Sequence, residues 1–284
     1  MRNVRRAAVA GSWYPGDAPT LTAEVERHLA RAARDGRDVA GDLVALVAPH
    51  AGLVYSGPVA AHAYRLLRDR RFDVAVLVGP SHFVGFDGVS IYSSGGFATP
   101  LGVLPVDEPC ASRLLGATPI VREHAAVHGR EHSLEMQLPF VQRVAPGIRI
   151  VPLLMGHQTA ETAQALGDAL STALAGRNAL LVASTDLSHY YDAGTAARLD
   201  AVVIDCVARL DADGLQSALD ARPDHACGGG PTVAVLRAAK ALGARDSVVL
   251  NYADSGDVSG DKSAVVGYMA AALGTFSTRD EGHE

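Results

Sequence analysis

The chain reads LVALVAPH at Leu43–His50, VAVLVGPSH at Val74–His82 and ALLVASTDLSH at Ala179–His189. Each stretch is a short apolar run that ends in turn-forming residues and a histidine. Such runs are typical of strands that are buried on both faces of a sheet. Stretches with helical periodicity lie between them, so we expect an α/β fold with a mostly parallel central sheet and helices on both faces.

The same patterns predict the remaining elements. Helices are expected over residues 20–34, 58–68, 105–115 (starting near Asp107), 134–144, 159–174, 196–210 and 232–242, and strands over 43–48, 74–78, 89–92, 149–154, 179–183, 247–252 and 264–272. The stretch 93–102 reads as a loop. Pro58 is expected in the first turn of its helix, where proline is tolerated, and Pro152 favours an edge position for its strand. No linker divides the chain, so we expect one domain over 1–284 with a frayed polar tail at 278–284.

Composition excludes several classes of function. The formal net charge is −6 and no basic stripe occurs, which argues against nucleic acid and anionic membrane surfaces as partners. No run approaches the roughly 18 apolar residues of a membrane span. The N-terminal stretch lacks the apolar core of a secretory signal, so we expect a cytoplasmic protein. Three cysteines in 284 residues do not indicate a disulfide framework.

Candidate ligands follow two of the predicted strands. His50 and His82 share one pattern, in which an apolar run is followed by proline and then histidine. Either histidine alone reads as a hydrogen-bonded structural residue, but the two together favour a shared site at the carboxyl ends of the strands. Cys227 lies in ACGGGP, just before a predicted helix. A helix N-terminus favours a thiolate, which is a metal ligand or a nucleophile. The alternative is a small buried apolar residue.

The third strand leads to Asp186 and His189 in STDLSHY. On a helical turn these side chains would face the same way. Asp186 would then bind a metal or orient an imidazole, and His189 would act as a general base. The alternative for Asp186 is a helix cap.

The stretch REHAAVHGREHSLEMQ holds three histidines at four-residue spacing. It does not match the zinc-binding H-E-x-x-H pattern. We interpret His124 and His128 as residues that resemble a metal-binding pattern but lie outside the site. Glu131, His132 and Glu135 are stronger candidates, because a helix that starts near residue 133 would carry Glu135 inward beside the strand ends.

Five motifs, in order, carry a resemblance to a known family: APHAGLVYSGPVAAHAY, VGPSHF, EHSLEMQLPF, STDLSHY and CGGGP. They resemble the Memo family, whose bacterial members are also called AmmeMemoRadiSam system protein B. The similarity extends over nearly the whole chain. The family is similar in fold to class III extradiol dioxygenases, which are non-haem iron enzymes. The resemblance implies a metal pocket lined by His50, His82 and Cys227, with Asp186 and His189 beside it, and an association with iron or copper.

One departure affects the chemistry that this resemblance implies. Ring-opening dioxygenases bind Fe(II) through two histidines and one carboxylate, whereas Cys227 would be the third ligand here. A thiolate can be oxidised, whereas a carboxylate cannot, and the two ligands favour different metals. Dioxygenase activity is therefore an analogy drawn from the fold.

These observations lead to competing hypotheses. The first is a non-haem, metal-dependent, dioxygenase-like oxidoreductase, with iron(II) or else copper or zinc at His50, His82 and Cys227. His189, Asp186 and His132 would be catalytic. The partners would be O₂ and a small substrate, aromatic or of another kind, with a radical-SAM system component as a protein partner. The alternatives are an iron- or copper-binding redox protein without turnover, a peptide- or protein-binding module that uses the same cleft, and a metal-free cysteine hydrolase.

Overall fold

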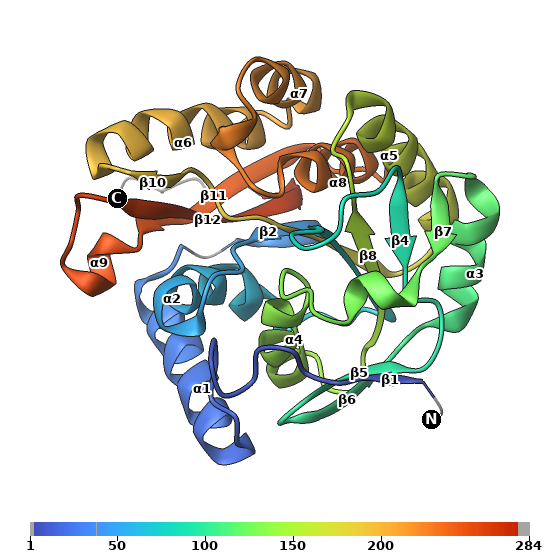
Figure 1. Cartoon of the computed structure of the whole chain (residues 1–284), viewed down its shortest axis with the longest axis horizontal. Coiled ribbons are helices and arrows are strands. Elements are labelled where there is room, and N and C mark those ends of the chain that lie inside the picture. Colours follow the sequence, from blue (N-terminus) through green and yellow to red (C-terminus); the bar gives the residue numbers. More distant parts are fainter. Residues whose placement is uncertain (1–2, 38, 278–284) are drawn as a thin grey trace.

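The computed structural model describes residues 3–37 and 39–277 of the chain. Four parallel strands form the centre of its main sheet (Figure 1). In spatial order they are β2 (Gly41–Ala48), β9 (Ala179–Ser184), β3 (Val74–Pro80) and β8 (Arg149–Met155). Because they are parallel and adjacent, their carboxyl ends meet at one edge of the sheet.

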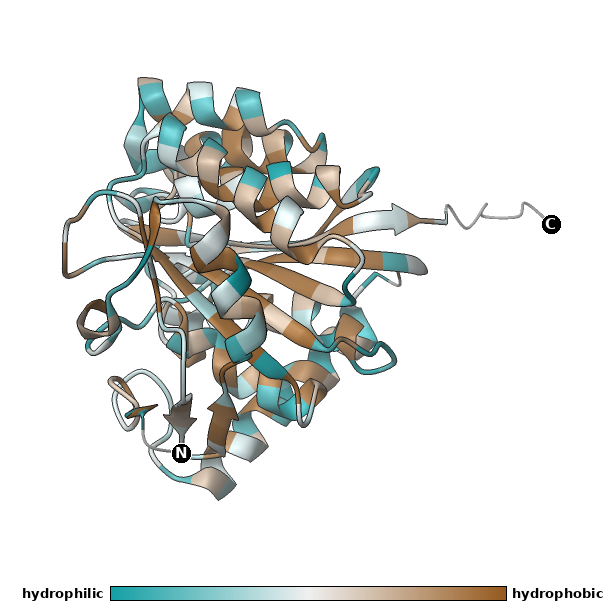
Figure 2. Cartoon of the chain, turned by 90° about the vertical axis from the view of Figure 1, so that its right-hand side faces the viewer, coloured by the Kyte–Doolittle hydropathy of each residue, from teal (hydrophilic) through white to brown (hydrophobic). Residues whose placement is uncertain are grey.

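Helices cover both faces of this sheet, as predicted (Figures 1 and 2). Alternate residues of each central strand enter two different apolar clusters; in β3, for example, Val76 lies in one cluster and Leu77 in the other. One cluster includes helices α1 (Ala18–Asp35), α2 (Leu53–Tyr64) and α4 (Leu138–Val144), and the other includes α3 (Glu108–Ala117), α5 (Ala160–Leu174), α6 (Ala193–Ala208), α7 (Ala212–Ala221) and α8 (Gly229–Ala241). The period of two along a strand explains why its whole run is apolar.

Antiparallel pairings extend the sheet on both sides. β12 (Val265–Phe276) runs antiparallel to β2 and also pairs with β11 (Asp246–Asp254) and β10 (His189–Tyr191). At the other end, β4 (Val89–Ile91) runs antiparallel to β8 and parallel to β7 (Val121–Glu123). Over the described residues the sheet has nine strands. The predicted α/β class with a parallel centre is confirmed.

The expectation of an edge position for the strand with Pro152 is wrong, because β8 lies between β3 and β4. The pairing explains how a proline fits there. On the β4 side the register covers only residues 153–155 of β8, so no ladder bond from the Pro152 nitrogen is required. The Pro152 carbonyl accepts a hydrogen bond from the Tyr92 amide at 3.3 Å.

The stretch expected as a loop at 93–102 contains strand instead. β5 (Gly96–Thr99) and β6 (Gly102–Pro105) form a hairpin, and β1 (Val4–Arg5) pairs in parallel with β5. The left-handed backbone of Gly102, with φ of 119°, permits the tight turn between them. This small sheet holds the N-terminal segment against the body of the molecule (Figure 1).

Two helix starts also differ from the sequence prediction. α2 begins at Leu53, so Pro58 lies inside the helix and not in its first turn. The chain near Pro139 forms a 3₁₀ turn before α4 begins at Leu138, and this places Pro139 in the first turn. The expected start near Asp107 is confirmed, since its side chain caps α3 through the Cys110 amide at 2.8 Å.

The remaining short elements are α9 (Gly256–Ser259) and the 3₁₀ turns η1 (Arg65–Leu67), η2 (Ala125–His128), η3 (Glu135–Gln137) and η4 (Pro223–His225). The polar tail expected at 278–284 lies outside the described residues. Among the described helices, none combines the length and the apolar character needed to cross a membrane.

Candidate metal centre

The carboxyl ends of the central strands bring the predicted side chains together. His50 lies two residues after β2, Asp186 two residues after β9, and His82 two residues after β3. His132 joins them from the segment that precedes α4. Over the described residues, ligand atoms of His50, His82 and His132 lie within 4.8 Å of one another, a spacing that could hold a metal ion.

The surroundings of His50 fix the protonation of its ring. The Ser184 hydroxyl donates to the Ser133 carbonyl at 2.6 Å, so its oxygen accepts from the His50 Nδ1–H at 2.9 Å. Gln137 donates to the same oxygen at 2.8 Å. The Nε2 of His50 therefore carries a free lone pair, and burial lowers the pKa of this histidine well below its usual value. A neutral, oriented imidazole is the form that binds a metal.

Glu131 orients His82 in the same way. Its Oε1 lies 2.9 Å from His82 Nδ1 and also accepts the amides of His132 and Ser133 at 2.8 Å each. Its Oε2 accepts the His82 amide at 2.6 Å. Burial alone would raise the pKa of Glu131, but its hydrogen bonds to His82 and Ser133 lower it to about 2. The permanent carboxylate holds a proton on Nδ1 of His82 and leaves Nε2 available as a ligand.

His132 lies in a stack of rings. Its ring is nearly parallel to that of His82, with centroids 4.5 Å apart, and Trp13 packs on it at 4.2 Å. Burial lowers the pKa of His132 to about 4, so the ring is neutral at pH 7. The ring of His50 meets that of His82 at 74° and that of His132 at 77°.

Cys227 lies against His50 from the start of α8. Its Sγ is 3.2 Å from the Nε2 of His50. The glycine after it permits this approach, since a Cβ on Gly228 would lie 2.3 Å from the Ser184 carbonyl oxygen. The sequence predicted a thiolate favoured by the helix N-terminus. In the structure, burial and then the nearby Asp186 carboxylate raise the pKa of the Cys227 thiol above its usual value, so without a metal the thiol is favoured.

Asp186 contacts His50 through its side chain and Cys227 through its backbone. Its Oδ1 accepts the His50 amide at 2.7 Å and the Ala51 amide at 3.3 Å. Its own amide donates to the Cys227 sulfur at 3.3 Å, and its carbonyl accepts the Cys227 amide at 3.2 Å. Burial raises the pKa of Asp186 to about 7. Asp186 therefore positions His50 through its carboxyl group and Cys227 through its backbone, and the carboxyl group can hold a proton near neutral pH.

The predicted helical turn at Asp186 and His189 is wrong, because the chain between them is irregular and His189 begins β10. Asp186 consequently does not cap a helix. His189 lies 2.8 Å from the Leu187 carbonyl through its Nδ1, which must carry the proton because a carbonyl can only accept. Its Nε2 is therefore free to accept a proton, and burial lowers the pKa of His189.

The other acidic and histidine candidates have structural contacts. Glu135 is fully buried but binds the N-terminal segment, through Arg5, the Ala8 amide at 2.8 Å and the Tyr14 hydroxyl at 2.6 Å. It does not lie on the helix that was expected from residue 133. The N-terminal segment that it holds carries Trp13 onto His132.

His124 and His128 lie outside the histidine cluster of the described residues, as predicted. His128 is buried, with its Nε2 3.1 Å from the Ser90 hydroxyl. Sequence reasoning missed two other residues. Ser184 fixes the tautomer of His50, and His157 follows β8 just as His82 follows β3. The signal for His157 was the run RIVPLLMGH, which repeats the pattern of an apolar run that ends in histidine.

The fold and the site together define an α/β protein with a cluster of side chains that could hold a metal ion at the carboxyl ends of its parallel strands. The profile of the family described as Memo-like protein matches residues 5–272. The chain belongs to the Memo family.

Similar proteins support this membership. A MEMO1 family protein of Methanosarcina acetivorans is 40% identical over 270 residues, which cover 94% of this chain and 98% of the relative. A MEMO1 family protein of Methanothermobacter thermautotrophicus is 37% identical over 272 residues, which cover 93% and 98%. The crystal structure of an uncharacterized Escherichia coli protein matches with a TM-score of 0.59 at 17% identity. It covers 82% of this chain and all of that one, and at this identity it shows the fold alone.

Proposed function

We propose that this protein is a non-haem, metal-dependent oxidoreductase that holds a transition metal ion, in the first place iron(II), at the strand ends. The observation that carries the proposal is the pair of oriented imidazoles. His50 and His82 each have Nδ1 committed to a partner, Ser184 or Glu131, so each Nε2 carries a lone pair, and that of His50 faces the Cys227 sulfur at 3.2 Å. Such partners are typical of histidines that bind metals.

Cys227 is the third ligand in this proposal. Its sulfur already lies 3.2 Å from the Nε2 of His50, a separation suited to two ligands of one ion. The ligand atom of His132 also lies within 4.8 Å of those of His50 and His82, but its ring stacks on His82 and contacts Trp13. We assign His132 to the wall of the site, where its neutral ring can exchange a proton with a bound molecule.

A bound metal would supply a Lewis acid and a redox centre that can engage O₂. The chain supplies the remaining functions. His189 accepts a proton at its free Nε2. Asp186 holds His50 and Cys227 in place, and its raised pKa lets it retain or release a proton near pH 7.

Exposed aromatic side chains favour a small substrate with an apolar or aromatic part. Trp13 is 38% exposed and Phe83 is 52% exposed, and both rings contact His132, with centroids 4.2 and 5.9 Å away. Large exposed aromatic side chains beside a candidate site are typical of ligand contacts.

The test begins with metal content. The protein is purified without oxygen, and bound metal is measured for the wild type and for the variants His50→Ala, His82→Ala and Cys227→Ser. His124→Ala is the matched control, since it removes a histidine outside the cluster. We expect the first three variants to lose most of the metal and the control to retain it. Unchanged metal in both histidine variants would contradict the proposal.

Oxygen uptake then distinguishes an oxidoreductase from a metal-binding protein without turnover. The iron-loaded protein is incubated with a panel of catechols and other small aromatic compounds, and dissolved oxygen is followed. Uptake that depends on His189 supports an oxidoreductase. Metal binding without any uptake would favour the second candidate, a redox-active metal-binding protein without turnover, which the sulfur beside His50 also supports.

A further inference from the structure

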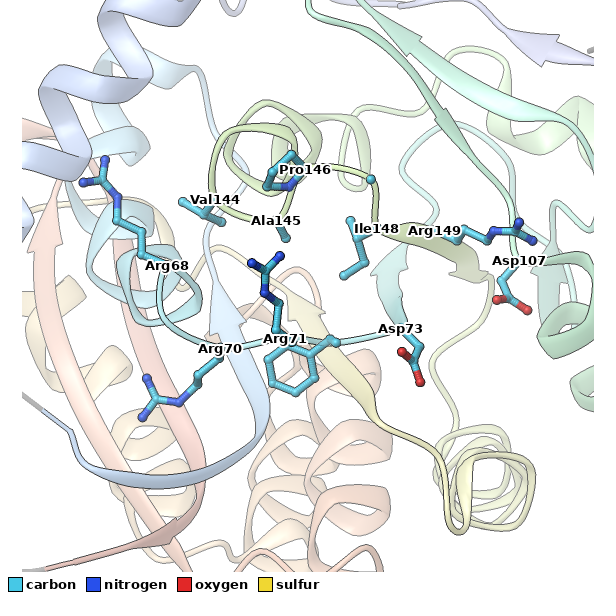
Figure 3. Close-up of a pocket in the computed structure, with 12 residues that line it drawn as sticks. Arg68, Arg70, Arg71, Asp73, Asp107, Val144, Ala145, Pro146, Ile148 and Arg149 are labelled. Carbon is cyan, nitrogen blue, oxygen red and sulfur yellow. The ribbon is translucent and has the colours of Figure 1, made fainter.

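A second pocket lies at the opposite edge of the sheet. It has a volume of about 500 Å³ and is bounded by the segments before β3 and β8 (Figure 3). Asp73 directly precedes the first residue of β3, and Arg149 is the first residue of β8. β3 is seven residues long, so this pocket lies about 20 Å from the histidine cluster. The metal centre therefore does not account for it.

Arginine dominates this pocket. Arg68, Arg70, Arg71 and Arg149 line it, together with two carboxylates, those of Asp73 and Asp107. The chain as a whole has a formal net charge of −6, so a local excess of positive charge stands out. A concentration of one sign of charge in a concave site attracts ligands of the opposite sign.

Within the described residues, neither Asp73 nor Asp107 forms an ion pair with one of these four arginines. Asp107 lies 3.7 Å from Arg177, which is not among the pocket residues, and it also caps α3. Glu26 pairs with Arg68 at 2.7 Å and with Arg143 at 2.9 Å, so one carboxylate serves two arginines.

Two of the pocket arginines remain available. Within residues 3–37 and 39–277, the side chains of Arg71 and Arg149 have neither an ion pair nor a hydrogen bond. Figure 3 shows the Arg71 side chain directed toward Ala145 across the pocket. A free guanidinium group offers several donors in a planar fork that matches phosphate oxygens.

Arg70 adds a fixed positive charge. Its guanidinium group donates to the carbonyls of Leu66 at 2.7 Å, Val39 at 2.8 Å and Gly41 at 3.2 Å. These neutral partners hold the group in place without cancelling its charge. Apolar side chains form another part of the wall, with Phe72, Val144 and Ile148 among them. The pocket thus combines cations that can bind an anionic group with a surface that can take an apolar or planar body.

We propose that this pocket binds a small phosphorylated molecule, with its phosphate groups on Arg71 and Arg149. Phosphate is favoured because four arginines line this pocket and because the guanidinium groups of Arg71 and Arg149 can each form paired, charge-assisted hydrogen bonds with it. The shared chemistry is the phosphate group. The molecule is either an inorganic phosphate or a nucleotide whose planar base packs on the apolar wall.

Isothermal titration calorimetry in the presence of EDTA tests the proposal. The probes are pyrophosphate, ADP and adenosine, and the proteins are the wild type, the double variant Arg71→Ala/Arg149→Ala, and the control Arg209→Ala. Arg209 is a surface arginine on the α6 side that pairs with Asp205. A melting curve for each variant checks that it folds.

We expect ADP or pyrophosphate to bind, adenosine alone to bind far more weakly, and the double variant to lose tenfold or more in affinity. Binding should weaken as salt is added. Tighter binding of ADP than of pyrophosphate would identify a nucleotide, and equal binding an inorganic phosphate. The proposal is overturned if neither anion binds at millimolar concentration, or if a folded double variant binds as tightly as the wild type.

Two further variants test whether the anion binds in this pocket or at the candidate metal centre. His50→Ala and His82→Ala should retain full affinity for the anion, because both lie at the other edge of the sheet. If they abolish binding, the anion occupies the metal centre and the second pocket is not its site. If the double variant only melts earlier and no anion binds to the wild type, the two arginines contribute to stability alone and the proposal is wrong.

Discussion

Replacing Glu131 with glutamine should destabilise the protein and loosen His82. The carboxylate is almost wholly buried, with 2% of its side chain exposed, and it accepts four hydrogen bonds within 3 Å. An amide of the same shape has one oxygen and one NH₂ group. The NH₂ group would face N–H donors, so at least one buried donor would lose its partner.

The magnitude follows from the pKa. Burial opposes ionisation, but hydrogen bonds from His82 and Ser133 lower the pKa of Glu131 from its ordinary 4.5 to about 2. At about 1.4 kcal/mol per pKa unit, this difference is worth about 3 kcal/mol of folding free energy. Because the pKa is lower in the folded state, the stabilisation is complete above about pH 5 and is lost as the pH falls toward 2. About 2 kcal/mol of it should be gone at pH 3.

Urea unfolding, followed by circular dichroism at pH 7 and pH 3, measures the effect. We expect Glu131→Gln to lose about 3 kcal/mol at pH 7 and much less, relative to the wild type, at pH 3. Glu123→Gln is the matched control, since Glu123 accepts a backbone amide at 3.1 Å on the surface and should change little. A loss below about 1 kcal/mol at pH 7, or an equal loss at both pH values, would refute this reasoning.

Three further predictions concern the same region and its support. Gly156→Ala should destabilise the protein by several kcal/mol, because the new Cβ would lie 2.0 Å from a backbone carbonyl oxygen. The control Gly116→Ala meets open space in a helix and should stabilise the protein slightly. Equal melting temperatures of the two variants would contradict this prediction. Burial raises the pKa of Asp186 to about 7 from its ordinary 3.8, so its ionisation costs the folded state stability as the pH rises from 4 to 7. Asp186→Asn should therefore gain stability relative to the wild type over that range in urea unfolding. Trp13 is the single tryptophan and packs on His132, whose pKa burial lowers to about 4, so its fluorescence should change as the pH falls through 4. The change should disappear in His132→Gln, and its persistence there would count against the contact.

The sequence predicted the parallel centre of the sheet because its strands are apolar on both faces and alternate with helical stretches. It also predicted that His50 and His82 meet, since parallel strands end at one edge. Local structure was less predictable where it depends on pairing with strands that are distant in the sequence. Pro152 fits inside the sheet only because β4 is too short to pair with it. The hairpin at β5 and β6 exists because the N-terminal strand completes its sheet.

The partners of the candidate ligands were harder to predict. Ser184 is the last residue of a buried strand, and its role depends on a hydroxyl that donates to Ser133, far away in sequence. Glu131 was singled out without a role, which its contact with His82 now gives. The thiolate expected at Cys227 was wrong for the metal-free protein, because a helix N-terminus does not outweigh burial and the Asp186 carboxylate.

X-ray absorption spectroscopy of the iron-loaded protein, compared with Cys227→Ser loaded in the same way, tests whether His50, His82 and Cys227 bind one metal ion. We expect imidazole nitrogen and one sulfur in the ligand shell of the wild type, and loss of the sulfur in the variant. A shell without sulfur, unchanged by the substitution, would show that Cys227 is not a ligand and that a set such as His50, His82 and His132 holds the ion instead.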